Sequence, residues 1–188
     1  RISSKDLPLV DSVQLEHART LCRRDEQKVE LSSVVRDTVI CGSVVRIRKG
    51  FRGNLQIFAS DSVIVEEGAM LEYPSGIYVD SGERRPYVSL ERGSKVNGYI
   101  IVTSENSDSQ LRHPSYVHKS GATINGLLYV DGSCNIEGDI IGAAYVKDCY
   151  YYSNGNVYAG TLYDARVVRS DSLAFPIFLE GPYERKMI

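Results

Sequence analysis

The chain has no tryptophan and only two methionines, and its charge is nearly balanced, with 22 Lys and Arg against 24 Asp and Glu. A balanced charge produces no field that would attract nucleic acid, and the basic face typical of nucleic-acid-binding domains is missing. No run reaches the ~18 to 20 apolar residues of a membrane-spanning helix, and no signal-peptide pattern occurs. We therefore expect a soluble chain that does not bind nucleic acid. Because the sequence begins with Arg1, we expect membrane attachment only through an anchor upstream of that residue.

Metal-binding spacing is also missing, because the cysteines are far apart and form no CxxC or Cys/His cluster. The four are Cys22, Cys41, Cys134 and Cys149. Buried free thiols are the simpler interpretation. One or two disulfides in an oxidising compartment are the alternative, with Cys22–Cys41 and Cys134–Cys149 as the pairs to test. We predict no metal site and no cofactor.

The best-known catalytic motifs are absent as well: the sequence has no GxSxG, Walker-type loop, HExxH or GxGxxG followed by a helix. These absences exclude the commonest routes to hydrolysis, phosphoryl transfer and dinucleotide chemistry. We assign no catalytic residue from the sequence and expect a protein that is not an enzyme.

What the chain does contain favours β-structure. It has thirteen Tyr and sixteen Gly, and Val and Ile dominate its short apolar runs. β-Branched and aromatic residues fit a pleated surface better than a helix. Only the segment 12–29 differs, because Leu15, Ala18 and Leu21 fall near a helical spacing. It predicts a short helix or an irregular cap, followed from Leu31 by strands and turns.

Three segments share the frame Gly-small-x-apolar-polar-Gly-x-apolar, and two earlier segments match it loosely. The three are 92–102, 120–130 and 131–141, and the looser copies are 49–57 and 67–71. Glycine permits the positive φ of a tight corner, and the apolar residue between corners points inward. A unit this short can bury its apolar face only by stacking on neighbours. The frame therefore predicts an all-β fold, a single-stranded parallel β-helix (β-solenoid) with a short N-terminal helical or irregular cap.

An antiparallel sandwich is the competing fold, since it also has many short strands. Against it, Asn97-Gly98 and Asn125-Gly126 lie inside the repeated frame and not between strands. Two interruptions, 73–86 and 103–115, are interpreted as loops. We expect one domain overall, with an N-terminal cap segment (1–30), a β-solenoid (31–165) and a C-terminal capping tail (166–188).

The second interruption raises the question of a catalytic base. His113 and His118 lie in or beside this loop, and a hexapeptide acyltransferase would use a histidine base on a left-handed β-helix. The sixfold spacing fits from Val130 to Ile136, but Ile140 and Ile141 fall out of step. Solvent-exposed loop histidines are the favoured interpretation.

Carboxylates and tyrosines offer two further candidates. A polysaccharide-active β-helix would need clustered carboxylates in a groove, for which the sequence provides the groups near the first loop. Consecutive tyrosines could stack on sugar rings, but they alternate faces along a strand, so packing within a cap is favoured. A solvated surface is likewise favoured for the charged groups. The groups are Glu66-Glu67, Asp80 and Glu83-Arg84-Arg85, and the tyrosines are Tyr145, Tyr150-Tyr151-Tyr152 and Tyr158.

In the segments 92–102 and 120–141, with weaker support from 49–71, the Gly-Ser-x-Val-x-Gly-x-Ile-x-Val pattern resembles the bactofilin-like, polymer-forming β-helix proteins. The resemblance implies a bacterial scaffold without catalysis whose coils associate end to end. The two interruptions, the N-terminal segment and the Tyr-rich tail depart from that family.

Together these features predict a non-catalytic structural, scaffold or adhesion-type protein of the cell envelope or periplasmic face, with a cytoplasmic location as the alternative. The expected partners are proteins or further copies of the chain, with a glycan as another candidate. The alternative function is a carbohydrate-binding, carbohydrate-active or acyltransferase β-helix enzyme.

Overall fold

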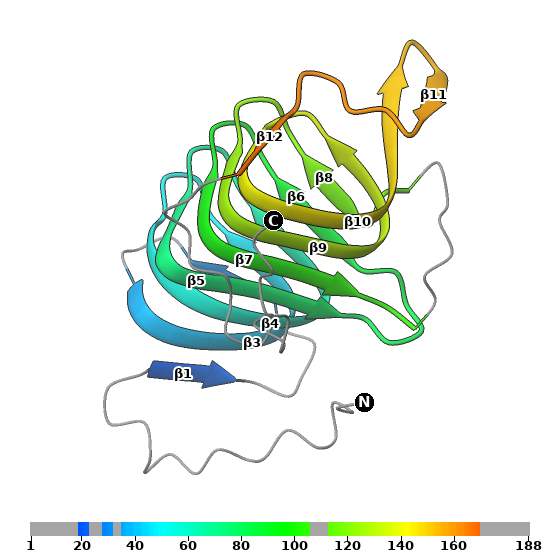
Figure 1. Ribbon diagram of the computed structural model, residues 1–188. Coiled ribbons are helices and arrows are strands. Elements are labelled where there is room, and N and C mark those ends of the chain that lie inside the picture. Colours follow the sequence, from blue (N-terminus) through cyan, green and yellow to red (C-terminus); the bar gives the residue numbers. More distant parts are fainter. Residues whose placement is uncertain (1–18, 23–27, 32–34, 106–112, 170–188) are drawn as a thin grey trace, which may run out of the picture.

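A computed structural model describes residues 19–22, 28–31, 35–105 and 113–169, with side chains described from residue 37 onward. These residues form twelve strands (Figure 1). The strands are β1 (Arg19–Cys22), β2 (Lys28–Leu31), β3 (Val35–Ile47), β4 (Arg52–Val65), β5 (Met70–Asp80), β6 (Tyr87–Leu90), β7 (Lys95–Thr103), β8 (Tyr116–His118), β9 (Thr123–Ile136), β10 (Asp139–Ser153), β11 (Asn156–Ala159) and β12 (Arg166–Val168).

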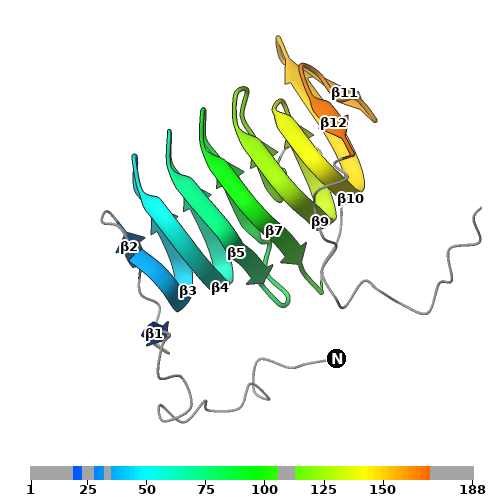
Figure 2. The same ribbon diagram turned by 60° about the vertical axis from the view of Figure 1, so that its left-hand side comes forward.

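Six of these strands form a closed barrel in which every neighbouring pair is parallel. Going round the barrel, β4 pairs with β5, β5 with β7, β7 with β9, β9 with β8, β8 with β6, and β6 with β4 again. Strands β3 and β10 extend the β4–β5–β7–β9 wall on either side (Figure 2), and β1, β2, β11 and β12 pair with these two. The fold is therefore an all-β, six-stranded parallel barrel with extra strands outside it.

The closure depends on two long strands. β4 pairs with β5 through Arg52–Ala59 and with β6 through Ser62–Val65. β9 pairs in the same way with β7 through Thr123–Val130 and with β8 through Cys134–Ile136. Each of these strands therefore belongs to two walls, and the short strands β6 and β8 complete the ring.

The all-β class is confirmed, but the predicted single-stranded parallel β-helix (β-solenoid) is wrong, because the strand pairing closes into a ring. The shared glycine frame does not establish a repeat architecture either. Its first two copies lie side by side on β7 and β9, where Asn97 is opposite Asn125. In the third copy, residues 131–136 continue β9 towards its pairing with β8, and only residues 139–141 lie opposite 123–125. The same local geometry recurs there because adjacent parallel strands in register face the same steric environment.

The predicted N-terminal helix is wrong over the residues that the structure describes. Residues 19–22 and 28–31 are strands that pair in parallel with β3, and the remainder of 12–29 lies outside the described residues. The helical spacing of a few apolar residues did not decide the structure of this segment. The edge of β3 offers unpaired backbone hydrogen-bonding groups, and a parallel strand satisfies them.

The antiparallel sandwich is excluded by the same pairings, because among the described residues every strand pair is parallel except the β10–β11 hairpin. The loop predicted over 73–86 is shorter than expected, because β5 continues to Asp80. The predicted loop over 103–115 joins β7 to β8, and its residues 106–112 lie outside the described part. The tail beyond residue 169 also lies outside it.

The core lies between the walls of the barrel and is almost entirely aliphatic. In β4 the residues Leu55, Ile57, Val63 and Val65 are each at most 1% exposed, whereas their neighbours, apart from the buried Ser62, are exposed or half-buried. Burying one such side chain contributes roughly 1.5 to 3 kcal/mol, so the inward-facing rows of the wall account for most of the stabilisation. In β4, Gln56 and Phe58 lie between these rows and are half-buried or exposed on the outer face.

Candidate functional site

His118 is buried in the barrel core and is not a loop residue. It lies on β8 with no exposed surface, and its Nδ1 is 3.2 Å from the hydroxyl of Tyr116 on the same strand. The two rings meet edge to face, and Cys134 of β9 lies opposite Tyr116. Burial lowers the pKa of His118, although the Ala122 carbonyl and the Asp139 carboxylate act in the opposite direction. The imidazole is therefore neutral at physiological pH.

This buried group has no route to a substrate. Tyr116 and Cys134 are also fully buried, and burial raises the pKa of both, so neither is an acid or a nucleophile near neutral pH. The Nε2 atom of His118 makes no hydrogen bond to the described residues. His113 is exposed and lies outside the strands, so the structure does not bring the two histidines together in a site.

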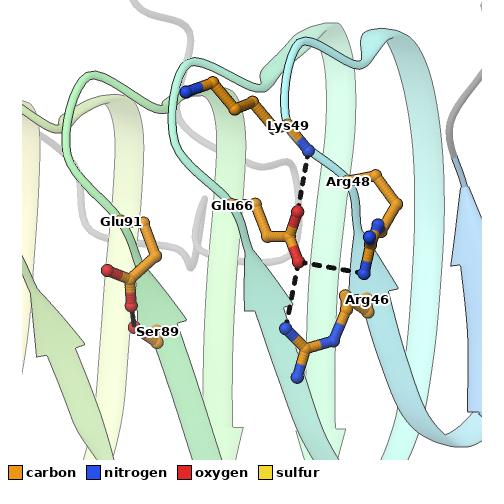
Figure 3. A network of polar contacts seen from close by, with 6 residues as sticks. All are labelled: Arg46, Arg48, Lys49, Glu66, Ser89 and Glu91. Atoms are coloured by element: carbon orange, nitrogen blue, oxygen red, sulfur yellow. Dashed lines mark hydrogen bonds and ion pairs between the residues drawn. The ribbon is translucent and has the colours of Figure 1, made fainter.

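Among the carboxylates near the first interruption, Glu66 is held by contacts with three basic residues. Glu66 accepts a hydrogen bond from Arg46 at 3.0 Å and another from the backbone N–H of Lys49 at 2.9 Å, and its carboxylate is 3.4 Å from the Arg48 guanidinium (Figure 3). The Arg46 hydrogen bond contributes most to a pKa of Glu66 below its ordinary value. Glu66 therefore keeps its negative charge to lower pH than an ordinary glutamate, and it joins two turns.

The remaining charged residues near Glu66 line an open depression of about 470 Å³ on the turns that follow β3, β4 and β6. Glu67 pairs with Lys49 at 3.0 Å, and Glu91 accepts a hydrogen bond from Ser89 at 2.6 Å (Figure 3). We call Arg46, Arg48, Lys49, Glu66, Glu67 and Glu91 the charged turn surface. The ion pairs of these residues form within the surface itself, as is usual for charged side chains on a solvent-exposed face.

Asp80 and the segment 83–85 do not join this surface. The Asp80 carboxylate accepts a hydrogen bond from the Gly82 N–H at 3.1 Å and so closes the turn after β5. Glu83, Arg84 and Arg85 are exposed. The structure therefore does not bring Asp80 and Glu83 together with Glu66 and Glu67 in one groove, which is the arrangement that the alternative of a polysaccharide-active site would need.

The tyrosine cluster packs mainly on itself at the C-terminal hairpin. Tyr150 is 8% exposed, and the Tyr151 ring stacks on Tyr163 with centroids 4.3 Å apart and lies 6.1 Å from Tyr158. These contacts fit the favoured interpretation of tyrosines that pack within a cap. Tyr145 does not belong to this cluster.

The outer face of the long wall carries a row of apolar side chains that sequence reasoning missed. Backbone register places each of them opposite the next on the neighbouring strand, and alternation along each strand turns them away from the core. We call them the aromatic row: Phe58, Tyr78, Ile101, Tyr129 and Tyr145, on β4, β5, β7, β9 and β10. An aromatic residue at the outward position of an alternating strand was the one sequence signal for this row. No sequence feature showed that these positions lie next to one another on neighbouring strands.

Both expected states of the cysteines, a disulfide and buried free thiols, occur in the structure. Cys41 is disulfide-bonded and lies opposite Cys22 in the register of β1 and β3. Cys134 and Cys149 are free thiols, the first fully buried and the second half-buried. The described residues contain no group of three or more His, Cys, Asp or Glu side chains arranged to bind a metal ion. They also contain no helix with the length and apolar character that crossing a membrane requires.

No protein-family description, curated protein or solved structure is significantly similar to this chain. The resemblance to bactofilin-like proteins therefore stays an expectation from the sequence.

Proposed function

We propose that this protein is a non-catalytic binding scaffold of adhesion type that acts at the cell envelope. The observation that carries the proposal is the combination of buried reactive groups with an exposed aromatic row on a rigid wall. His118, Tyr116 and Cys134 are enclosed in the core, and Glu66 is neutralised by two arginines. The residues that remain available on the surface are suited to contact and not to turnover.

A disulfide at Cys41 supports the envelope location, because disulfides persist in oxidising compartments. The parallel wall supports the scaffold role. Each strand from β3 to β10 in this wall is hydrogen-bonded to the next, so the surface is already ordered before a ligand binds.

The experiment that tests the proposal incubates the purified chain with isolated cell-envelope material and sediments the mixture. We expect saturable co-sedimentation with no low-molecular-weight product detectable by mass spectrometry. A His118→Gln variant that still folds should co-sediment as well as the wild type, because the imidazole is enclosed. Release of a product, or no binding to envelope material, would contradict the proposal.

A further inference from the structure

The aromatic row has a fixed spacing that the backbone imposes. Its five side chains lie on five consecutive strands of one wall, so at the ~4.8 Å separation of paired strands the row spans about 19 Å. The rings of Phe58 and Tyr78 have centroids 6.1 Å apart and are inclined by 54°. The row therefore runs across the strands and presents one large apolar or aromatic side chain per strand, with a ring on every strand except β7, where Ile101 lies.

These side chains are exposed although they are apolar. Phe58 is 36% exposed, Tyr129 42% and Tyr145 56%, while Tyr78 and Ile101 are half-buried between them. A phenylalanine on the solvent side of a strand contributes less to folding than it would in the core. A contiguous exposed row of this kind marks an interaction surface.

Hydrogen-bonding groups border the row on both sides. Gln56 lies two residues before Phe58, and Tyr99 lies two residues before Ile101, so both face the same side of the wall as the row. The Tyr99 hydroxyl donates a hydrogen bond of 2.7 Å to the Gln56 side chain. Two residues after Tyr78, Asp80 lies opposite Thr103 in the register of β5 and β7. The ligand that fits must therefore combine an apolar face with hydroxyl groups at its edges.

The charges along the row exclude a polyanion. Asp80 and Asp131 follow Tyr78 and Tyr129 by two residues, on the same side of the wall, and Lys147 is the cation at the equivalent position after Tyr145. Binding of single-stranded nucleic acid combines stacking with a positively charged groove, which this border lacks. A folded protein partner would cover about 800 Å² of each surface, far wider than one row of side chains.

We propose that the aromatic row binds a neutral oligosaccharide that lies across strands β4 to β10, with sugar rings stacked on Phe58, Tyr129 and Tyr145. The apolar C–H face of a pyranose ring packs on an aromatic ring, and its hydroxyls reach Gln56, Tyr99 and Asp80 at the border. Aromatic rings on β4, β5, β9 and β10, with Ile101 between them on β7, match a chain of similar units. This inference rests on the proposed function, since it names the ligand class of that scaffold.

The test measures binding of the full chain to soluble neutral hexasaccharides (cello-, xylo-, laminari- and chito-oligosaccharides) by isothermal titration calorimetry, with heparin as the anionic comparison. We expect saturable binding of at least one neutral hexasaccharide and none of heparin. Tyr129→Ala and Tyr145→Ala should each weaken binding roughly tenfold, which corresponds to the loss of one aromatic contact.

Two controls separate stacking from folding. Tyr129→Phe and Tyr145→Phe keep the ring and should bind within about twofold of the wild type. Tyr87→Ala removes a tyrosine that is 37% exposed on β6, outside the row, and should bind like the wild type. Circular dichroism confirms that each variant is folded.

Failure of all neutral hexasaccharides to bind would overturn the inference. Equal binding by the wild type and a folded Tyr129→Ala/Tyr145→Ala double variant would overturn it too. A wild-type chain that binds envelope material but no neutral glycan would keep the proposed function and refute only its glycan ligand.

Discussion

Glycine is required at one position of three neighbouring strands. Gly98, Gly126 and Gly142 lie opposite one another on β7, β9 and β10, with φ between 146° and 149°. A Cβ atom at Gly126 would lie 1.7 Å from the carbonyl oxygen of Gly98, and one at Gly142 would lie 1.9 Å from that of Gly126. Any side chain there would push adjacent strands apart.

We predict that Gly126→Ala destabilises the fold by roughly 2 to 4 kcal/mol, since it adds both backbone strain and a steric clash with a strand that cannot move away. The free energy of unfolding, measured with urea, checks this. The matched control is Gly68→Ala, where φ is +68° but the surrounding space is open, and the loss should be only about 1 kcal/mol. Equal losses for the two variants would show that close approach is unimportant.

His118 makes the stability of the fold depend on pH. In the unfolded chain a histidine binds a proton below about pH 6.5, whereas burial lowers the pKa of His118 in the folded state. Between these two pKa values the unfolded state binds a proton that the folded state does not. The free energy of unfolding should therefore fall as pH drops below about 6.5, by at most about 1.4 kcal/mol per pH unit from this group.

Urea unfolding between pH 5 and pH 8 measures that slope. We predict a flatter profile for His118→Gln than for the wild type, whatever its absolute stability. A wild-type slope that survives in His118→Gln would assign the pH dependence to other groups.

At the scale of elements, the charged turn surface links the turn after β3 to the turn after β4 through Glu66. The Glu66 side chain is 20% exposed and its partner Arg46 is 37% exposed, so solvent screens the pair. We predict that Glu66→Gln costs about 1 kcal/mol or less at low salt and less still at 1 M salt. Glu67→Gln is the control, since its pair with Lys49 is far more exposed and should contribute less.

The same carboxylate gives a second pH effect, in the same direction as that of His118 but at lower pH. The pKa of Glu66 is lowered in the folded state, so its contribution is complete above the unfolded value near 4.5 and is lost as pH falls through the folded value. Thermal unfolding at pH 3 and pH 6 should therefore show a smaller difference between Glu66→Gln and the wild type at pH 3. A difference that does not shrink at pH 3 would assign the effect of Glu66 to packing instead of charge.

The sequence was sufficient to predict that the chain is β-structured, because Val and Ile alternate with polar residues in segments such as 52–65. It was not sufficient to predict the barrel. Closure depends on β6 and β8, which have only four and three residues, and on β4 and β9 turning from one wall to another. Such short strands carry no periodic signal of their own.

The aromatic row was beyond sequence reasoning for a related reason. Phe58 and Tyr78 are twenty positions apart, while Tyr78 and Ile101 are twenty-three apart, because the connections between strands differ in length. Register between parallel strands is fixed by backbone hydrogen bonds and core packing, which one sequence does not display. His118 was misplaced in a loop because a histidine next to a polar segment looks exposed until its strand is paired.

At the scale of the whole molecule, the continuous pairing from β3 to β10 predicts cooperative unfolding. Cys134 is fully buried with its pKa raised by burial, so it should react with a thiol reagent only when the barrel opens. We predict that its labelling follows the same urea transition as circular dichroism. Labelling well below that transition would show that the β8–β9 region opens separately.

The same reagent counts the free thiols. In denaturant without reductant we expect two to react, Cys134 and Cys149, because Cys41 is disulfide-bonded. A count of four would exclude the disulfide and with it the argument for an oxidising compartment.

The alternation of inward and outward side chains on β9 restricts changes in chain length. One residue inserted between Gly126 and Tyr129 would exchange the two faces of the rest of the strand, so that Tyr129 would point into the core and Val130 into solvent. The connection between β5 and β6 has no such constraint, since Glu83, Arg84 and Arg85 are exposed there. An epitope tag or a fluorescent protein should therefore be accepted directly after Arg85, where it leaves the hydrogen bonds from Ser81 and Ser104 to the Arg84 carbonyl in place. Natural variants of this chain should differ in length there while keeping β9 at constant length.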